Sequence, residues 1–402
     1  MNILITTFSF PSPKDNLYDG KFILSEAISY AINGANVRVV MPHYFDAQRI
    51  QTVYNNITVY RFKYLTPKWW ETLKMPGVPM YSRKSFFSVI QIPILCLFFC
   101  LNIIKHADWA DIIHAQWTVT ALLALPAKWL FGKKIVVTAR GSDLRLLPNW
   151  VNSFIHKHVD AAIDCFGPQH WNIEYKKNFP AHYIQLPLIV HKDASGIIPE
   201  DMKQQRSYRS GTFNILYVGR FDPIKLNDNK LPLFNLIHAA KILKEKNMKF
   251  QVLFIGDGNE QIKKEIKHLI DIYDLHDFVT LLGPKINVLD YVKFCDLGVG
   301  GIAFNSVSEE FTIMGKPQLL VKSIDNEDTP WRHGINCIFI ESDNKTDLTE
   351  KLIWAYEHRC ELKNIGEKAK NDMIEYITDS KNGGRLYLEA FSILLRRGAN
   401  GS

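Results

Sequence analysis

Short apolar runs alternate with helix-length segments along the first half of the chain. Six of these runs have the length and the β-branched composition of buried strands. They span residues 1–6, 36–41, 57–62, 111–114, 134–139 and 161–165. Because consecutive parallel strands need a long crossover connection, this alternation predicts a parallel sheet with helices on both faces.

The sequence turns polar around residues 207–212, and a second series of the same kind follows. Its expected strands span residues 213–218, 250–256, 278–283, 297–301, 318–321 and 337–341. Helix-length segments such as 233–246 and 260–273 lie between them. We therefore expect this half to form a second doubly wound α/β sheet.

Two domains also follow from length, because 402 residues exceed what one hydrophobic core usually supports. We expect a first domain at residues 1–206, a second at 207–380 and a last segment at 381–402. The helix in that segment, roughly 384–397, is free to cross back to the first domain. Sheets of this type bind ligands at the carboxyl ends of their strands, so we expect two Rossmann-like domains that face each other across a cleft.

The composition, with 47% hydrophobic and 22% charged residues, is that of a globular protein. Its six cysteines are scattered and include no C-x-x-C pair. Cys96 and Cys100 have helical i,i+4 spacing, but a metal site would need histidine or further cysteine nearby, so buried packing is favoured. Free thiols and an N-terminus without a signal peptide indicate the reducing cytoplasm.

The net charge of +7 is concentrated between residues 51 and 105. Glu71 is the only acid in this stretch, which also holds aromatic residues. Its basic residues are Arg61, Lys63, Lys68, Lys74, Arg83, Lys84 and Lys105, and its aromatic residues include Trp69, Trp70, Tyr81, Phe86 and Phe87. A cationic and aromatic surface suits an anionic bilayer better than nucleic acid, so we expect residues 61–105 to contact the inner face of the membrane.

The apolar run at residues 86–104 is about long enough for a transmembrane helix. Ser88, Gln91, Pro93 and Asn102 interrupt it, however, and a Rossmann-type strand follows at once. We interpret the run as a helix packed on the N-terminal sheet with one end touching lipid. A wholly buried core helix is the alternative.

The strongest chemical signal in the chain is the segment from Gly219 to Lys225. A strand ends, a glycine follows, and the cations Arg220 and Lys225 stand five residues apart. A guanidinium fork and an ammonium group at the end of a strand suit a diphosphate, because its departure builds negative charge that needs to be neutralised. The alternative is a solvated basic loop, since arginine and lysine are usually just exposed.

Gly219-Arg220-x4-Lys225 resembles the G-R-x4-K motif that opens the donor domain of the family 4 glycosyltransferases, which have the GT-B fold. The order and spacing of further motifs agree with this family over nearly the whole chain. Residues 256–258 resemble its G-D-G turn, 282–283 its L-G pair, 111–116 its D-v-v-H-x-H strand and 140–143 its H-G-x-D motif. The resemblance implies Arg220 and Lys225 as catalytic residues, with Gly219 and Gly256 on the donor side.

The family's E-x7-E motif is only half present. The second glutamate stands five residues before a Gly-x-Pro, which maps it to Glu310 through residues 315–317, and the first falls on Ile302. In the family the first acid touches the transferred sugar and the second binds the ribose hydroxyls. The resemblance therefore supports nucleotide binding by Glu310, whereas Ile302 removes the usual sugar contact.

The loop before Glu310 offers a phosphate site of its own. Backbone amides of Phe304, Asn305 and Ser306 are expected to cap a helix N-terminus aimed at phosphate. Glu309 is the second choice for the missing acid, although adjacent helical residues point about 100° apart.

The first domain supplies the expected sugar and acceptor side. There Arg140 and Asp143 fall on the H-G-x-D motif, and His114 falls on the D-v-v-H-x-H strand. Arg140 stands where many relatives have a histidine near the sugar, and it either pairs with an acidic group of the donor or acceptor or is purely structural. Gly20 closes the loop after the first strand, where a family glycine lets the backbone approach the diphosphate.

The expected activity is retaining transfer of a sugar from a UDP- or GDP-linked donor to a hydroxyl of a glycan or lipid-linked saccharide, in surface polysaccharide biosynthesis. The resemblance implies neither a cofactor nor a metal, and the chain has no D-x-D triplet to hold one. One alternative is a degenerate member that binds nucleotide without transfer and acts as a partner or regulator, as Ile302 suggests. The other is a different GT-B chemistry such as nucleotide-sugar epimerisation, which Glu310 makes less favourable.

Overall fold

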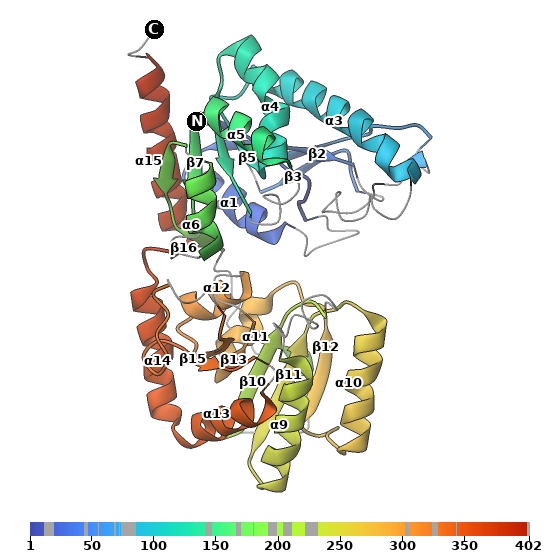
Figure 1. Cartoon of the computed structure of the whole chain (residues 1–402), viewed down its shortest axis with the longest axis vertical. Helices are drawn as coiled ribbons and strands as arrows, with labels where there is room; N and C mark the ends of the chain where they lie inside the picture. Colours follow the sequence, from blue (N-terminus) through green and yellow to red (C-terminus); the bar gives the residue numbers. More distant parts are fainter. Residues whose placement is uncertain are drawn as a thin grey trace. The chain divides into compact units, whose positions relative to one another are not determined.

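The chain forms two compact units (Figure 1). The computed structural model describes residues 1–11, 20–43, 47–54, 56–67, 70–71, 73, 86–140, 147–165, 170–179, 181–191, 199–203, 211–221, 232–301, 306–323, 329–342 and 344–399. Unit 1 consists of Met1–Gly167, Trp171–His191 and Thr378–Ser402, and unit 2 of Pro168–His170 and Lys192–Ile377. The division after His191 lies earlier than the predicted boundary at residue 206. The strands Leu188–Val190 (β9) and Ile377–Asp379 (β16) pair with each other where the chain leaves and re-enters unit 1.

Unit 1 is built on an eight-stranded sheet in the order β3-β4-β2-β1-β5-β6-β7-β8. All neighbours are parallel except β3 and β4, which are antiparallel. The strands are β1 (Asn2–Thr6), β2 (Asn36–Pro42), β3 (Ile50–Val53), β4 (Ile57–Phe62), β5 (Ile112–Gln116), β6 (Lys134–Thr138), β7 (Ala161–Asp164) and β8 (Tyr183–Gln185). All six strands expected in this half are confirmed, and β3 and β8 extend the sheet at its two edges.

Helices cover both faces of this sheet. The connection from β1 to β2 runs toward the β3 edge of the sheet through α1 (Lys21–Ile32). The connections from β4 through β5 and β6 to β7 run toward the β8 edge, through α3 (Phe86–Ala107), α4 (Thr118–Phe131) and α5 (Asn149–His158). Because parallel crossovers are right-handed, α1 lies on one face and α3, α4 and α5 lie on the opposite face. A further helix of this half is α6 (His170–Asn178).

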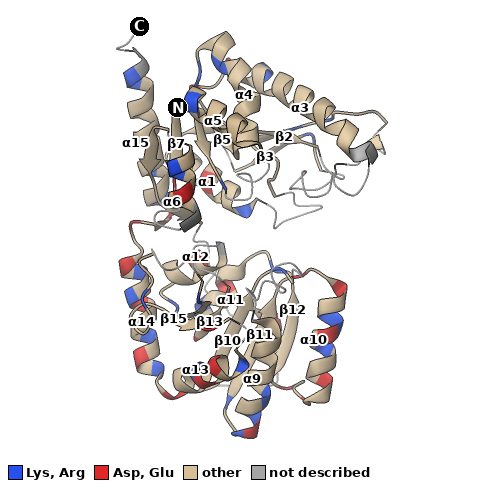
Figure 2. Ribbon diagram, in the orientation of Figure 1, with Lys and Arg blue, Asp and Glu red and all other residues tan. Residues whose placement is uncertain are grey.

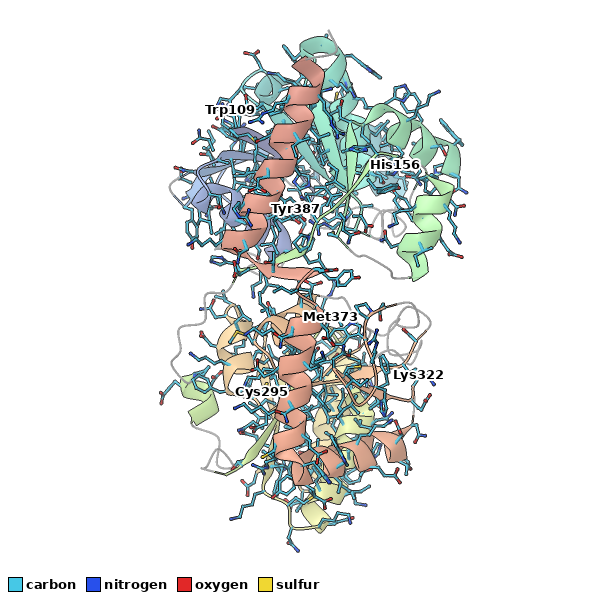
Figure 3. All side chains as sticks on the ribbon, turned by 90° about the vertical axis from the view of Figure 1, so that its left-hand side faces the viewer. Trp109, His156, Cys295, Lys322, Met373 and Tyr387 are labelled. Atoms are coloured by element: carbon cyan, nitrogen blue, oxygen red, sulfur yellow. The ribbon has the colours of Figure 1, made fainter. Side chains whose placement is uncertain are left out.

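The last helix, α15 (Ser380–Ala399), returns to unit 1 as expected and packs on α1. The approach is close, because a Cβ on Gly384 would lie 2.1 Å from the carbonyl oxygen of Ser29 on α1. Tyr387 on α15 is fully buried (Figure 3), and its ring centroid lies 5.7 Å from that of Tyr30. Glycine at residue 384 thus allows α15 to pack directly against α1.

Unit 2 is built on a six-stranded parallel sheet in the order β12-β11-β10-β13-β14-β15. The strands are β10 (Phe213–Val218), β11 (Phe250–Ile255), β12 (Val279–Gly283), β13 (Leu297–Val299), β14 (Gln318–Val321) and β15 (Ile338–Ile340). The helices among the described residues are α7 (Glu200–Lys203), α9 (Leu233–Glu245), α10 (Glu260–Ile272), α11 (Val288–Phe294), α12 (Ser306–Ile313), α13 (Lys345–Glu357) and α14 (Arg359–Asp372). Every strand expected in this half is confirmed.

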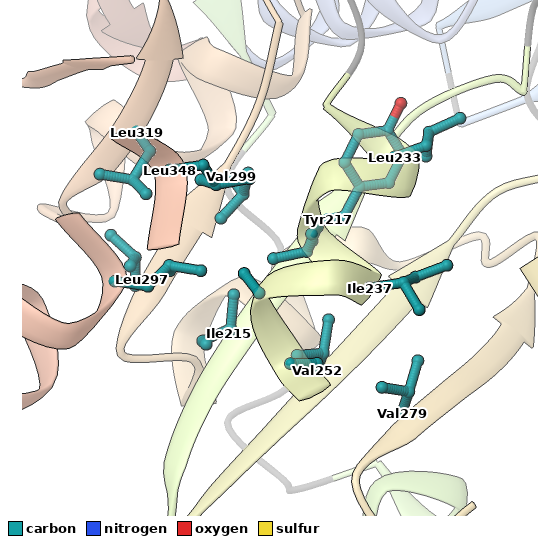
Figure 4. Packing of buried hydrophobic residues seen from close by; sticks show 14 of the residues in the cluster. Ile215, Tyr217, Leu233, Ile237, Val252, Val279, Leu297, Val299, Leu319 and Leu348 are labelled. Atoms are coloured by element: carbon teal, nitrogen blue, oxygen red, sulfur yellow. The ribbon is translucent and has the colours of Figure 1, made fainter. Parts of the chain in front are cut away.

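The central strand β10 divides the core of unit 2 because its side chains alternate between the two faces of the sheet. Ile215 and Tyr217 pack in a cluster with Leu233 and Ile237 of α9 (Figure 4). Leu216 belongs to a second cluster on the opposite face with residues of α11 and α12. The strand is buried on both sides, and accordingly five of its six residues are hydrophobic.

The cationic stretch expected to face a membrane is partly internal. Arg61 is 3% exposed and donates hydrogen bonds to the carbonyl oxygens of Gln48 and Pro11. Glu71 is also 3% exposed, and its Oε1 accepts from the backbone amide of Tyr64. Of the remaining residues of this stretch, Lys68, Trp69, Lys74, Tyr81, Arg83 and Lys84 lie outside the described residues. Arg61 was wrongly assigned to the surface because a buried arginine satisfied by carbonyl oxygens has no distinctive sequence signal.

Candidate functional site

The strand order of unit 2 reverses between β10 and β13. From β10 the chain proceeds outward to β11 and β12, and then returns to add β13 on the other side of β10. In open α/β sheets, ligands bind beyond the carboxyl ends of the strands at such a reversal. Gly219 and Arg220 follow β10 directly, and α12 follows β13. Topology therefore brings the two predicted donor-binding segments of this unit to the same edge of the sheet.

The backbone on both sides of Arg220 is fixed to the neighbouring turn. The amide of Gly219 donates to the carbonyl oxygen of Ile255 at 3.0 Å, and the amide of Phe221 donates to that of Asp257 at 3.0 Å. Phe221 itself is buried, whereas Arg220 is exposed. The result is an arginine with an anchored backbone and a guanidinium in solvent. Lys225 lies outside the described residues.

Glycines of the G-D-G turn make this anchoring possible. Gly256 has a φ of +146°, and a Cβ there would lie 1.9 Å from the carbonyl oxygen of Gly219. Gly258 has a φ of +157°, and its Cβ would lie 2.5 Å from the carbonyl oxygen of Phe221. Gly256 was predicted on the donor side, and its observed contact is with the backbone that carries Arg220.

We expect Gly256→Ala to destabilise unit 2 by about 2–3 kcal/mol, because the new Cβ overlaps a backbone atom at a φ that L-residues rarely adopt. Urea unfolding measures this loss. Gly334→Ala is the matched control, since Gly334 also has a positive φ, +74°, with nothing within 4 Å of its Cβ position. Equal costs for the two substitutions would contradict the steric argument.

Both acids of α12 are buried. Glu309 is 6% exposed and Glu310 is 9% exposed, a burial that carboxylates tolerate only when they are well partnered. The helix begins at Ser306, and Ile302, Phe304 and Asn305 lie outside the described residues. The structure thus places the two candidate acids on the helix that follows β13, and burial does not distinguish between them.

In unit 1 the strand order reverses between β1 and β5. Gly20 ends the loop after β1 and caps α1, with its carbonyl oxygen accepting from the amide of Ile23 at 2.9 Å. Its φ is +74°, and a Cβ there would lie 2.6 Å from the carbonyl oxygen of Ser9. Glycine is therefore required here by contact with the backbone of Ser9 in the same loop. This loop lies at the edge of the sheet where ligands of this fold bind.

Arg140, which follows β6, is part of a buried charged network. The Nη2 group of its guanidinium donates to Glu26 Oε1. Its Nε donates to Gln116 Oε1 at 3.0 Å. Gln116 in turn donates from Nε2 to Glu26 Oε2 at 2.7 Å. The side chains of Arg140 and Glu26 are 7% and 3% exposed. Although burial opposes it, the neighbouring Glu26 carboxylate raises the pKa of Arg140, so the guanidinium is charged.

His114 on β5 lies next to Gln116 of this network and is fully buried. Its Nε2 is 2.8 Å from Thr138 Oγ1, and its Nδ1 is 3.2 Å from the hydroxyl of Tyr30. Burial lowers the pKa of His114 to about 4, so the ring is neutral at neutral pH. We interpret His114 as a residue that positions its neighbours. Asp143 lies outside the described residues.

Sequence reasoning did not identify Glu26, the partner that fixes Arg140. A signal was present, because Glu26 is the single acid in α1, whose sequence KFILSEAISYAI is mostly apolar or small. An acid on the buried stripe of such a helix needs a cationic partner.

Across the described part of the chain, no group of three or more His, Cys, Asp or Glu residues is placed to hold a metal ion.

The structure is similar over its full length to several solved structures. HepE of Anabaena in complex with UDP and glucose is 14% identical, with 98% of this chain and 99% of that chain covered and a TM-score of 0.67. Sucrose-phosphate synthase of Thermosynechococcus elongatus is 15% identical, with 98% and 100% covered and a TM-score of 0.68. A glycosyltransferase of Rickettsia africae is 16% identical, with 98% of each chain covered and a TM-score of 0.65.

No protein-family model and no curated protein matches the chain. At these identities the structural matches show the fold. The expectation of two doubly wound α/β domains of the GT-B type, with a last helix that returns to the first domain, is therefore confirmed.

Proposed function

We propose that the protein is a retaining glycosyltransferase that uses a nucleotide diphosphate sugar, UDP- or GDP-linked, as its donor. One observation carries the proposal: Arg220 is an exposed cation on an anchored backbone at the point where the strand order of unit 2 reverses. A guanidinium held there matches the oxygen pattern of a diphosphate. The fold adds support, since the crystal structure of HepE, a protein of the same fold, is a complex with UDP and glucose.

The proposed reaction breaks the bond between the anomeric carbon and the diphosphate. Arg220 and Lys225 neutralise the charge that develops on the leaving diphosphate, and the sugar passes through an oxocarbenium-like state. The acceptor hydroxyl attacks from the face that the phosphate leaves, so the anomeric configuration is retained. Two side-chain cations supply the stabilisation that Mg²⁺ gives in other transferases, so we propose that the reaction needs no metal.

Further groups are assigned from the motifs that their sequence positions match. On the donor side, Glu310 binds the ribose hydroxyls and the amides at 304–306 approach phosphate at the start of α12. In unit 1, Gly20 shapes the loop beside β1, and the acceptor is a hydroxyl of a glycan or a lipid-linked saccharide. We place the reaction in surface polysaccharide biosynthesis, on the cytoplasmic side of a membrane.

Slow hydrolysis of labelled donors in the absence of acceptor tests this function. We expect the protein to release sugar from one of a panel of UDP- and GDP-hexoses, because glycosyltransferases that hold a donor also transfer it slowly to water. Gly334→Ala, whose new Cβ lies in unit 2 with nothing within 4 Å of it, is expected to release sugar at the wild-type rate.

The observation that favours a second function is Ile302, which stands where the family's first acid would be. A degenerate, nucleotide-binding regulator would show a thermal shift with UDP or GDP and release no sugar from any donor of the panel. That combination would contradict transfer and support the regulator.

A further inference from the structure

About half of the exposed large hydrophobic residues in the described part of the chain lie on three neighbouring helices of unit 1. Nineteen large hydrophobic side chains among the described residues are exposed, and ten of them lie on α3, α4 and α5. We name these ten residues the apolar face: Val89, Ile90, Leu97, Phe98, Leu101, Trp129, Leu130, Phe131, Trp150 and Phe154. The three helices lie on the same face of the sheet, opposite α1 and α15, and contribute to one core cluster.

α3 carries apolar residues on its outer side as well as on its inner side. Its inner side carries Leu95, Phe99 and Ile103, each at most 1% exposed, in the core of unit 1. Its outer side carries residues such as Leu97 and Leu101, which are 57% and 52% exposed. A helix in water normally has a polar outer stripe, so a helix without one is expected to be covered by another apolar medium.

This helix is long and apolar enough to cross a bilayer, with a candidate span at Val89–Ala107, of which 28% is buried. A span is nevertheless incompatible with the fold, because the inner side of α3 packs on the sheet and β5 begins at Ile112. The geometry instead suits a helix that lies along a surface with only its outer side immersed.

The ends of α4 and α5 extend the same surface with aromatic rings. Trp129 and Phe131 on α4 are 62% and 41% exposed, and Trp150 and Phe154 on α5 are 74% and 40% exposed. Tryptophan is enriched at the level of lipid headgroups, where its ring is apolar and its N–H can reach water. Two tryptophans this exposed beside an apolar helix are typical of a protein that contacts a bilayer.

The charge of these helices points to an anionic surface. α3, α4 and α5 contain no Asp or Glu and three lysines, Lys105, Lys128 and Lys157. Figure 2 draws α3 and α4 almost wholly in tan, whereas α10 and α14 of unit 2 carry both signs. Lys128 pairs with Asp160, while Lys105 and Lys157 are exposed. An uncharged surface with cations at its margin is complementary to a bilayer that contains anionic lipids.

We propose that the apolar face docks onto an anionic bilayer, with α3 lying parallel to the membrane and Trp129 and Trp150 at the headgroups. This inference goes beyond the proposed function and does not depend on it, because a protein without transfer activity would dock equally well. It also moves the predicted membrane contact from residues 61–105 to three helices, two of which lie outside that stretch.

Co-sedimentation with vesicles of phosphatidylcholine and phosphatidylglycerol in equal parts tests the docking. We expect the wild-type chain to bind at low salt, and Trp129→Ser/Trp150→Ser to lower the partition constant about tenfold or more, since two large apolar side chains no longer leave water. Ile272→Ser/Ile374→Ser is the matched control, because these unit 2 residues are 59% and 69% exposed and lie off the apolar face. We expect the control to bind like the wild-type chain.

Three results would overturn the proposal. They are an absence of wild-type binding at low salt, an equal loss of binding in both double variants, and a Trp129→Ser/Trp150→Ser chain that binds vesicles normally. In the last case, light scattering during size-exclusion chromatography identifies the occupant. If that variant is a monomer and the wild-type chain a dimer, the face is an interface between two copies.

Discussion

Arg220→Ala slows donor turnover about 10²–10³-fold, the loss expected when one charge-stabilising donor is removed from a transition state. The physical reason is that the leaving diphosphate no longer meets a guanidinium at the edge of the unit 2 sheet. Little stability is lost, since Arg220 is exposed and its anchoring hydrogen bonds come from the backbone of Gly219 and Phe221. Initial rates of donor hydrolysis, together with the Tm, measure both quantities.

Two further variants separate charge from geometry at this position. Arg220→Lys keeps the charge but loses the fork, so we expect it to recover only part of the rate. Arg397→Ala removes an exposed arginine from the last turn of α15 and is expected to retain full turnover. Near-normal turnover in Arg220→Ala would remove Arg220 from the mechanism.

Glu26→Ala destabilises unit 1 by about 3–5 kcal/mol, because it leaves the Arg140 guanidinium buried without its carboxylate. Burial of the Arg140 and Glu26 side chains at 7% and 3% exposure makes water a poor substitute for the lost partner. The measurement is urea unfolding followed by circular dichroism, with unit 1 expected to unfold at a lower urea concentration.

The double variant Glu26→Met/Arg140→Met provides the control. Replacing both members of a buried pair by apolar residues is often close to neutral, so we expect most of the lost stability to return. A double variant as unstable as Glu26→Ala would show that the pair's charge is not the cause.

The pairing with Glu26 also bears on the role of Arg140 in donor choice. Because Arg140 is already paired with Glu26, we expect Arg140→Ala to change turnover of uronate and neutral hexose donors equally. Equal changes would support the structural interpretation of Arg140.

The fold was largely predictable because a parallel sheet buried on both faces leaves a simple signal. Strands such as β10 and β14 are mostly apolar runs whose bounds the sequence predicted to the residue. The strands β3, β8, β9 and β16 were not predicted. They have three or four residues each, lie at edges or in a two-stranded sheet, and are too short for a pattern of period two to stand out.

The site was predicted where it depends on local sequence and missed where it depends on packing. Gly219, Arg220 and Gly256 stand next to strand ends, so their place followed from the strands themselves. The pairing of Glu26 with Arg140 joins residues 114 positions apart in the chain, and neither residue indicates the other. Trp129 and Trp150 were not singled out either, because tryptophan is usually largely buried and nothing in the local sequence marks these two as exposed.

The proposed function depends on Arg220 holding the diphosphate of a nucleotide-linked sugar at the carboxyl edge of the unit 2 sheet. A crystal structure of the protein soaked with UDP or GDP shows whether it does. We expect a nucleotide beyond β10 and β13, with the Arg220 guanidinium donating to its diphosphate oxygens. A nucleotide bound elsewhere, or an Arg220 side chain turned away from the diphosphate, would contradict it.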